Sequence, residues 1–263
     1  MADFFNHIFI FLFGLAVGSF LNCVIYRLET GGTFLRGRSF CPHCKHLLVL
    51  RDLIPVFSFL FLKGRCRYCR KPISLQYPLV ELATAIIFLL IFWQFISTLF
   101  PFITILYFFI IASFLIVIFV YDLKHYIILD RVIYPAVVIA FLYNIYQFTI
   151  HHQQSTINNF LSAFGAAIFF LIIVLVSREK WLGVGDVKLA FLMGLFLGWP
   201  NILLALFLAF FVGAAVGTGL IIFDKKTLKS EIPFGPFLVT GTFLALFWGN
   251  ELIGWYQGLF LVK

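Results

Sequence analysis

The feature that most constrains this chain is the length of its uncharged apolar runs. Residues Leu189–Phe223 form 35 consecutive positions without a charged side chain. A single helix of that length would measure about 52 Å, whereas the hydrocarbon core of a bilayer is about 30 Å thick. The sequence Gly198-Trp-Pro-Asn201 within the run is typical of a turn, so we expect two membrane helices there. Only 11% of all residues are charged, against about 25% in soluble domains, which indicates an integral membrane protein.

The same reasoning along the whole chain predicts an all-α polytopic membrane protein with about eight transmembrane helices. We expect three parts: a first transmembrane helix in residues 1–26, a hydrophilic insert in 27–76, and a seven-helix membrane domain in 77–263. The eight apolar segments are Phe4–Ile25, Tyr77–Leu99, Pro101–Tyr121, Val132–Ile150, Phe160–Ser177, a short segment that begins near Asp186, Ile202–Phe223 and Phe237–Trp255.

The distribution of positive charge predicts how these segments are oriented. If the N-terminus lies outside, the inside loops are 27–76, 122–131, 178–188 and 224–232, and they hold 18 of the 19 Lys and Arg residues. Because positively charged loops stay on the cytoplasmic side, we expect the insert to be cytoplasmic. The insert alone carries ten of these charges, which predicts attraction to anionic membrane lipid. Topology already accounts for this charge, so nucleic acid is not an expected partner.

Four of the five cysteines form two C-x-x-C pairs within the insert, Cys41 with Cys44 and Cys66 with Cys69. Four thiolates suit tetrahedral zinc, and cytosolic thiols stay reduced. With all four positions filled by protein, no position remains for a catalytic water, so the spacing predicts a structural zinc in a ribbon-like insert. The alternative is four free or redox-active cysteines.

Two aspartates are the candidate catalytic residues, Asp122 and Asp186. Asp186 ends the motif Gly183-Val-Gly185-Asp186, whose glycines would let a peptide backbone approach the carboxylate closely. Two carboxylates brought together can share one proton, so that one activates water while the other polarises a carbonyl group. The alternative is that each aspartate caps or borders a helix, and Asp130 competes with Asp122 for the catalytic role.

In combination, the motifs resemble the type IV prepilin peptidases, a family of bifunctional leader peptidases and N-methyltransferases. The resemblance covers nearly the whole chain. It rests on Gly18-Ser-Phe-Leu-Asn22 through Tyr26-Arg27, the two C-x-x-C pairs, Asp52-Leu-Ile-Pro55, Gly64-Arg-Cys-Arg-Tyr-Cys69, Ile73-Ser-Leu-Gln-Tyr-Pro78, Val80-Glu81-Leu82, Asp122, Gly183-Val-Gly-Asp186 and Ile232-Pro-Phe-Gly-Pro236. One departure is Ile127-Ile-Leu-Asp130, because relatives often carry a proline before that aspartate.

The resemblance implies a bacterial enzyme of the cytoplasmic membrane with Asp122 and Asp186 as its catalytic pair. Such an enzyme cuts the basic leader from type IV prepilins or pilin-like proteins on the cytoplasmic face. It then methylates the new amino terminus with S-adenosylmethionine. The sequence places no methyl-donor site. Two alternatives remain open: another GxGD protease similar to presenilin or signal-peptide peptidase, and a non-enzymatic zinc-stabilised membrane scaffold or transporter.

Overall fold

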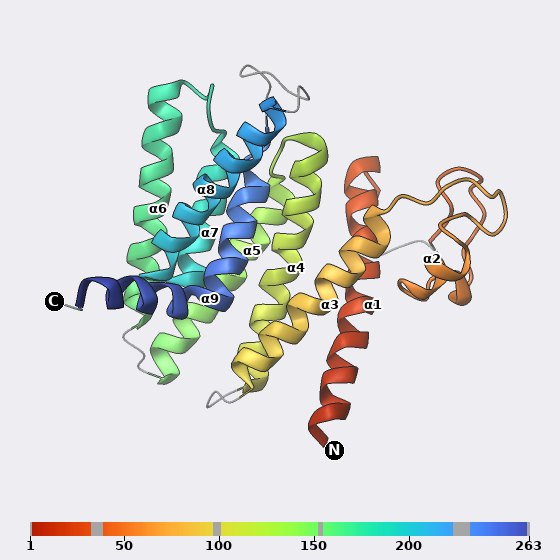
Figure 1. Cartoon of the computed structure of the whole chain (residues 1–263), viewed down its shortest axis with the longest axis horizontal. Helices are drawn as coiled ribbons and strands as arrows, with labels where there is room; N and C mark the ends of the chain where they lie inside the picture. The colour runs from red at the N-terminus through yellow and green to blue at the C-terminus, as the bar shows by residue number, and fades with distance from the viewer. Residues whose placement is uncertain (1, 33–38, 97–100, 152–154, 223–231, 262–263) are drawn as a thin grey trace. The chain divides into compact units, whose positions relative to one another are not determined.

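The computed structural model describes residues 2–32, 39–96, 101–151, 155–222 and 232–261, and all long elements within these ranges are helices (Figure 1). The helices are α1 (Ala2–Thr30), η1 (Leu50–Asp52), α2 (Phe57–Phe61), α3 (Gln76–Phe95), α4 (Pro101–His125), α5 (Asp130–His151), α6 (Ser155–Ser177), α7 (Val184–Leu197), α8 (Asn201–Ile222) and α9 (Gly235–Leu261). Each of the eight predicted membrane segments corresponds to one helix of at least 14 residues.

Among the described residues, seven helices are long and apolar enough to cross a membrane, namely α1, α3, α4, α5, α6, α8 and α9. The remaining segment, predicted to be short, is α7 with 14 residues. At 1.5 Å per residue it measures about 21 Å, less than the thickness of a bilayer core. The prediction of an all-helical, multi-pass membrane protein is confirmed, with a sixth segment too short to cross alone.

Packing divides the chain into two compact units, Met1–Val117 and Ile118–Lys263. The boundary falls within α4. The division into parts 1–26, 27–76 and 77–263 concerns function rather than packing, and it stays a prediction.

In the first unit, two glycines on α1 allow α1 and α3 to pack closely. A Cβ atom on Gly14 would lie 2.6 Å from the Cα atom of Ala85, and one on Gly18 would lie 2.6 Å from the Cα atom of Glu81. Glycines four residues apart are a common packing surface between membrane helices, because they let the two backbones approach. Sequence analysis singled out Gly18 only as part of a family motif, although the spacing from Gly14 was visible.

In the second unit, α7 is the inner helix and contacts α5, α6, α8 and α9. Its side chains from Leu189 to Phe196 are buried at all but one position. Gly194 lies so close to the backbone of α6 at Ala163 that no Cβ atom would fit between them. This packing leaves α7 little freedom to move relative to α6.

The C-terminal end of α7 is fixed by two asparagines from neighbouring helices. The side-chain amide of Asn144 donates a hydrogen bond to the carbonyl of Leu195 at 3.1 Å, and Asn159 donates to the Oδ1 atom of Asn144 at 2.8 Å. A short helix that ends inside a membrane leaves carbonyl groups that water cannot reach, and these bonds satisfy one of them. They also fix the position of the helix whose other end carries Asp186.

Candidate functional site

Asp122 lies in the last turn of α4, whereas the sequence predicted it in the polar connector 122–131. Hydropathy marks where side chains become polar, but the helical backbone continues for one more turn, to His125. Tyr126 then adopts a left-handed conformation with a φ of 59° and closes the helix by donating its N–H to the carbonyl of Asp122 at 2.9 Å. As a result the Asp122 residue is only 4% exposed.

The Asp122 carboxylate meets the N-terminus of α9. It accepts a hydrogen bond from the backbone N–H of Gly235, the first residue of that helix. N–H groups in the first turn of a helix have no partner within the helix, and the helix dipole favours negative charge there. A Cβ atom on residue 235 would lie 2.5 Å from the Oδ2 atom of Asp122, so only glycine fits without displacing the carboxylate.

The segment Pro233-Phe-Gly-Pro236 belongs to the motifs of the family resemblance, but the sequence alone indicates no role for it. The sequence does indicate a helix N-terminus here, because proline near the start of an apolar run is typical of one. The sequence could not show that this N-terminus belongs beside Asp122.

Asp186 lies in the first turn of α7 and is likewise buried, with 8% exposure. Its Oδ2 atom accepts a hydrogen bond from the backbone N–H of Gly183 at 3.0 Å. Gly183 precedes the helix in an extended conformation, so this bond closes the helix start in the manner of a capping box. Each candidate carboxylate therefore accepts a backbone N–H at the start of a helix, Asp186 at that of its own helix α7 and Asp122 at that of α9.

The structure brings the two carboxylates together. They are close enough for the charge of Asp122 to act on Asp186. The glycines beside the two carboxylates, Gly185 and Gly235, both lie next to one side chain, Ile128. A Cβ atom on Gly185 would lie 3.0 Å from its Cβ atom, and one on Gly235 would lie 3.4 Å from its Cδ1 atom. In the sequence, the connector that contains Ile128 differs from the family only by its missing proline, which does not indicate this contact.

The two glycines of the Gly183-Val-Gly185 motif differ in their surroundings. We expected both to leave space for a peptide backbone, but at Gly185 that space is filled by Ile128. At Gly183 the nearest atoms to an added Cβ are the Gly185 nitrogen at 3.9 Å and the Asp186 Oδ2 atom at 4.0 Å, both from the same motif. Only Gly183 therefore leaves space for a peptide backbone.

Asp130, the competing candidate, has the surroundings of a surface residue. Its side chain is 60% exposed and its Oδ1 atom lies 2.5 Å from the Nζ atom of Lys188. The same ammonium group lies 5.0 Å from the ring centroid of Tyr134. An exposed carboxylate paired with a lysine is a common surface arrangement, so the geometry favours Asp122.

The four insert cysteines form a cluster whose Sγ atoms all lie within 4.8 Å of one another. Tetrahedral zinc with Zn–S bonds of about 2.3 Å requires sulfur atoms about 3.8 Å apart. The Sγ atoms of Cys41 and Cys69 are separated by 3.9 Å, which fits this requirement. Burial raises the pKa of Cys41, but the backbone N–H groups of Cys44 and His43 outweigh it and lower that pKa, whereas the neighbouring thiols raise the pKa of Cys69, so the four sulfurs share the negative charge unequally.

The two C-x-x-C pairs share one backbone structure. In the first, Cys41 donates its N–H to the carbonyl of His46 at 3.0 Å, and in the second, Cys66 donates to that of Lys71 at 2.9 Å. The residue after each second cysteine, Lys45 and Arg70, has a φ of 58° and 57° respectively. This repeated turn holds two thiolates on one side of each knuckle, as a zinc ribbon requires.

An aspartate whose side chain is only 4% exposed joins the second knuckle to the preceding turn. Asp52 accepts hydrogen bonds from the Nε atom of Arg67 at 2.7 Å, from the hydroxyl of Tyr68 at 3.2 Å and from the backbone N–H of Val49 at 3.3 Å. Burial opposes ionisation, but these three donors and the charge of Arg67 together hold the pKa of Asp52 below its usual value.

Two family models match separate parts of the chain. Residues 12–95 match the family model of the bacterial peptidase A24 N-terminal domain, and residues 109–218 match that of the type IV leader peptidase family. The relative from Aeromonas hydrophila is 32% identical, over 96% of this chain and 94% of its own length. Relatives from Legionella pneumophila and Bacillus subtilis are 29% and 30% identical, over 98% and 94% of this chain and 96% of their own lengths. All three are named prepilin leader peptidase/N-methyltransferase.

The chain belongs to the prepilin leader peptidase/N-methyltransferase family. It is therefore a multi-pass membrane protein of an enzyme family, and the scaffold and presenilin-like alternatives are not needed. No solved structure gives a significant match. The leader peptidase match includes both buried aspartates, and the N-terminal match includes the cysteine insert.

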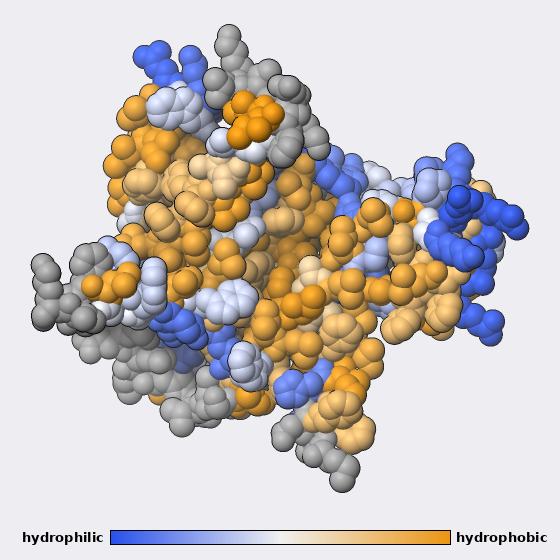
Figure 2. All heavy atoms as spheres, viewed as in Figure 1, coloured by the Kyte–Doolittle hydropathy of each residue, from blue (hydrophilic) through white to orange (hydrophobic). Residues whose placement is uncertain are grey.

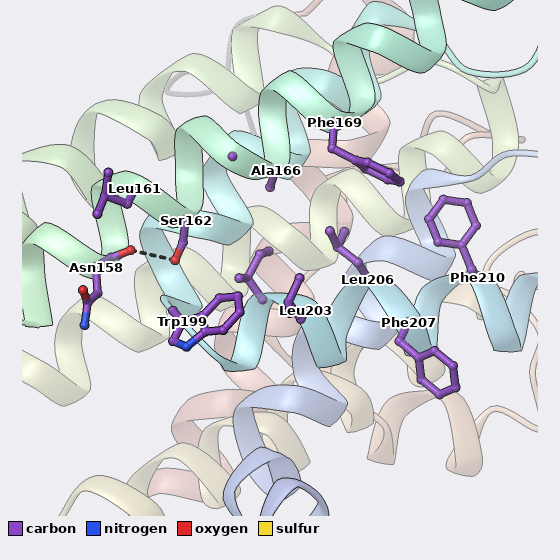
Figure 3. A pocket seen from close by; sticks show the side chains of 12 residues that line it. Asn158, Leu161, Ser162, Ala166, Phe169, Trp199, Leu203, Leu206, Phe207 and Phe210 are labelled. Atoms are coloured by element: carbon purple, nitrogen blue, oxygen red, sulfur yellow. Dashed lines mark hydrogen bonds between the residues drawn. The ribbon is translucent and has the colours of Figure 1, made fainter.

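This family member also has an apolar groove between α6 and α8, of about 570 Å³ (Figure 3). Phe169, Phe207 and Phe210 line it, and its polar groups lie near Asn158, Ser162 and Trp199. None of the predicted site residues lines the groove, and no ionisable side chain does. We therefore separate it from the carboxylate site.

Proposed function

We propose that this protein is a prepilin leader peptidase that cleaves with Asp122 and Asp186 and then methylates the new amino terminus of its product. The single observation that carries the peptidase proposal is the meeting of two buried carboxylates at the starts of α7 and α9. Both lie within the part of the chain that matches the type IV leader peptidase family.

The proposed chemistry follows from two buried acids of which one acts electrostatically on the other. Two buried carboxylates at close range share one proton more easily than both ionise. The unprotonated member takes a proton from water, which attacks the scissile carbonyl carbon while the protonated member donates a hydrogen bond to the carbonyl oxygen. The proton then passes to the leaving amine. The N–H groups of Gly183 and Gly235 hold the two carboxylates in place throughout.

The location of the site supports a substrate with one charged and one apolar part. Both acids lie at helix ends, next to connectors that contain basic residues such as Lys124 and Arg178. By the distribution of positive charge, these connectors face the cytoplasm. A type IV prepilin or pilin-like protein could keep its apolar helix in the membrane while its basic leader stays in the cytosol. The membrane would then position the scissile bond.

Zinc and S-adenosylmethionine are the proposed cofactors. The geometry of Cys41, Cys44, Cys66 and Cys69 fits a structural zinc ion, which would fix the fold of the insert. The proposed methyltransferase activity rests on the names of the relatives. We propose S-adenosylmethionine as the methyl donor. We assign no residue to the methyl-donor site.

The test is mass spectrometry of the amino terminus of a prepilin co-expressed with the protein in a strain that lacks its own peptidase. We expect a shortened, singly methylated product with the native chain. Asp122→Asn and Asp186→Asn should leave the leader attached, and Asp130→Asn should process normally because Asp130 is exposed and paired with Lys188. Normal processing by Asp122→Asn would contradict the proposal, provided that the variant is present in the membrane at the native level.

A further inference from the structure

One face of the short helix α2 exposes large apolar side chains. Phe57, Leu60 and Phe61 are 49%, 63% and 83% exposed, and Ile54, one turn earlier, is 48% exposed. The spacing of Phe57, Leu60 and Phe61 by three and four residues places these three on one side of the helix, and Ile54 lies in the turn before it. The ring of Phe59 points elsewhere, toward Gly64, where an added Cβ atom would lie 3.1 Å from it.

This apolar surface, formed by Ile54, Phe57, Leu60 and Phe61, is unusual for a small domain in water. Soluble domains rarely expose several large apolar side chains side by side, and such patches usually mark a contact with a partner or a membrane. We call these four residues the α2 patch.

The structure holds α2 beside the membrane helices of its own unit. Val56, the residue before α2, donates its backbone N–H to the Oε2 atom of Glu81 at 2.7 Å. Glu81 lies five residues into α3, about 7 Å from its start at 1.5 Å per residue. Figure 1 accordingly shows α2 level with the body of α1 and not beyond its C-terminal end. Since α1 and α3 are both long and apolar enough to span a membrane, this contact holds α2 beside the first turns of a membrane-spanning helix.

The charges around the α2 patch fit a lipid surface. Lys63 and Arg65 follow the helix directly and are exposed. The insert as a whole has ten basic residues against Glu29 and Asp52. Figure 2 shows the apolar side chains and the strongly hydrophilic ones of the insert on different parts of its surface. Apolar side chains beside Lys and Arg are the composition of segments that lie in a membrane interface containing anionic lipid.

We propose that α2 is an interfacial anchor that inserts the α2 patch between the lipids of the inner leaflet. Lys63 and Arg65 contact the phosphate groups of anionic lipids, while Phe57, Leu60 and Phe61 lie against the acyl chains. The anchor fixes the cysteine insert against the bilayer. This role is independent of the proposed peptidase and methyltransferase chemistry.

The experiment uses the full chain in nanodiscs made of phosphatidylethanolamine and phosphatidylglycerol. The photoreactive residue p-benzoylphenylalanine replaces Phe61 in one variant, Leu60 in a second and Tyr68 in a control. Tyr68 is a matched control because it is an exposed aromatic residue of the same insert whose hydroxyl contacts Asp52 in polar surroundings. Zinc content of one ion per chain shows that each variant keeps a folded insert.

After illumination, mass spectrometry should find lipid adducts at positions 60 and 61 at least about fivefold more often than at position 68. Equal or absent lipid adducts at positions 60 and 61 in zinc-loaded protein would overturn the proposal. Cross-linked dimers as the main product at position 61 would also overturn it, because the α2 patch would then cover a second copy of the chain.

Discussion

The carboxylate pair and the cysteine cluster are two candidate sites that the chain builds in opposite ways. Asp122 and Asp186 come from different helices, are almost fully buried, and are held by backbone N–H groups at the starts of α9 and α7. The cysteines come from two local knuckles with the same turn, and Cys44 is exposed. The comparison teaches that helix packing positions the acids, whereas local turn geometry positions the thiolates.

Apart from the two aspartates themselves, the largest effect should come from Gly235, where the carboxylate site depends on the absence of a side chain. A methyl group in Gly235→Ala would lie 2.5 Å from the Asp122 Oδ2 atom and displace that carboxylate. Since a displacement of about 1 Å can cost about 100-fold in rate, we expect a loss of that size in leader cleavage by purified enzyme. Gly254→Ala, in the same helix with open space around it, should stay close to the native rate. Near-native cleavage by Gly235→Ala would show that α9 does not hold Asp122.

Loss of a zinc ligand tests the cysteine cluster, the second of the two candidate sites. We expect Cys41→Ser to lose its zinc, because three thiolates hold the ion far less tightly than four and the metal stabilises the fold of the insert. Metal analysis should show about one zinc ion per native chain and little in the variant, together with faster proteolysis within residues 39–76. Cys23→Ser, on α1 outside the cluster, should keep its zinc. Unchanged zinc in Cys41→Ser would refute the four-thiolate site.

The two glycines of the Gly183-Val-Gly185 motif should differ in a way that the sequence does not indicate. In Gly185→Ala the new methyl group would lie 3.0 Å from the Cβ atom of Ile128, so α7 must shift slightly. We expect roughly a tenfold loss of cleavage, smaller than for Gly235→Ala because the clash is milder. Gly183→Ala has room and should cost little. The measurement is again the rate of leader cleavage by purified enzyme. An equal loss at both positions would mean that substrate contacts both glycines.

The smallest expected effect concerns Asp52, which joins the second cysteine knuckle to the preceding turn. Folding lowers its pKa below the usual value of 3.8, so its stabilising effect is present at neutral pH and is lost as the pH falls through the lower, folded value. Asp52→Asn removes the charge at pH 7. Because Arg67 is about half exposed, we expect only a twofold to fivefold faster proteolysis of the zinc-loaded insert, corresponding to about 0.5–1 kcal/mol. A variant as resistant as the native chain would show that the knuckle alone fixes this turn.

Much of the fold could be predicted because membrane helices leave a strong local signal. The apolar runs and the glycine–proline turn at 198–201 indicated seven long helices and the shorter α7. The cysteine cluster could be predicted because C-x-x-C spacing sets the knuckle geometry locally. The end of the helix that carries Asp122 was predicted about one turn too early, because the backbone remains helical after the side chains become polar.

The contacts around the carboxylates could not be predicted because they join distant parts of the chain. Nothing in the sequence relates Gly235 to Asp122, or Ile128 to Gly185, until the helices are packed. Likewise, the asparagines that fix the end of α7, Asn144 and Asn159, look like ordinary polar residues within apolar segments. Such residues gain their roles from helix packing.

The most direct test of the account is whether Asp122 and Asp186 act as one unit in cleavage. The measurement is the cleavage rate of a purified prepilin by native enzyme, by Asp122→Asn, by Asp186→Asn and by the double variant. We predict that each single substitution lowers the rate by about 10²–10⁴-fold and that the double variant is no slower than the worse single variant. A near-native rate for either single variant, or a double variant whose loss is the product of the two single losses, would contradict a shared-proton pair.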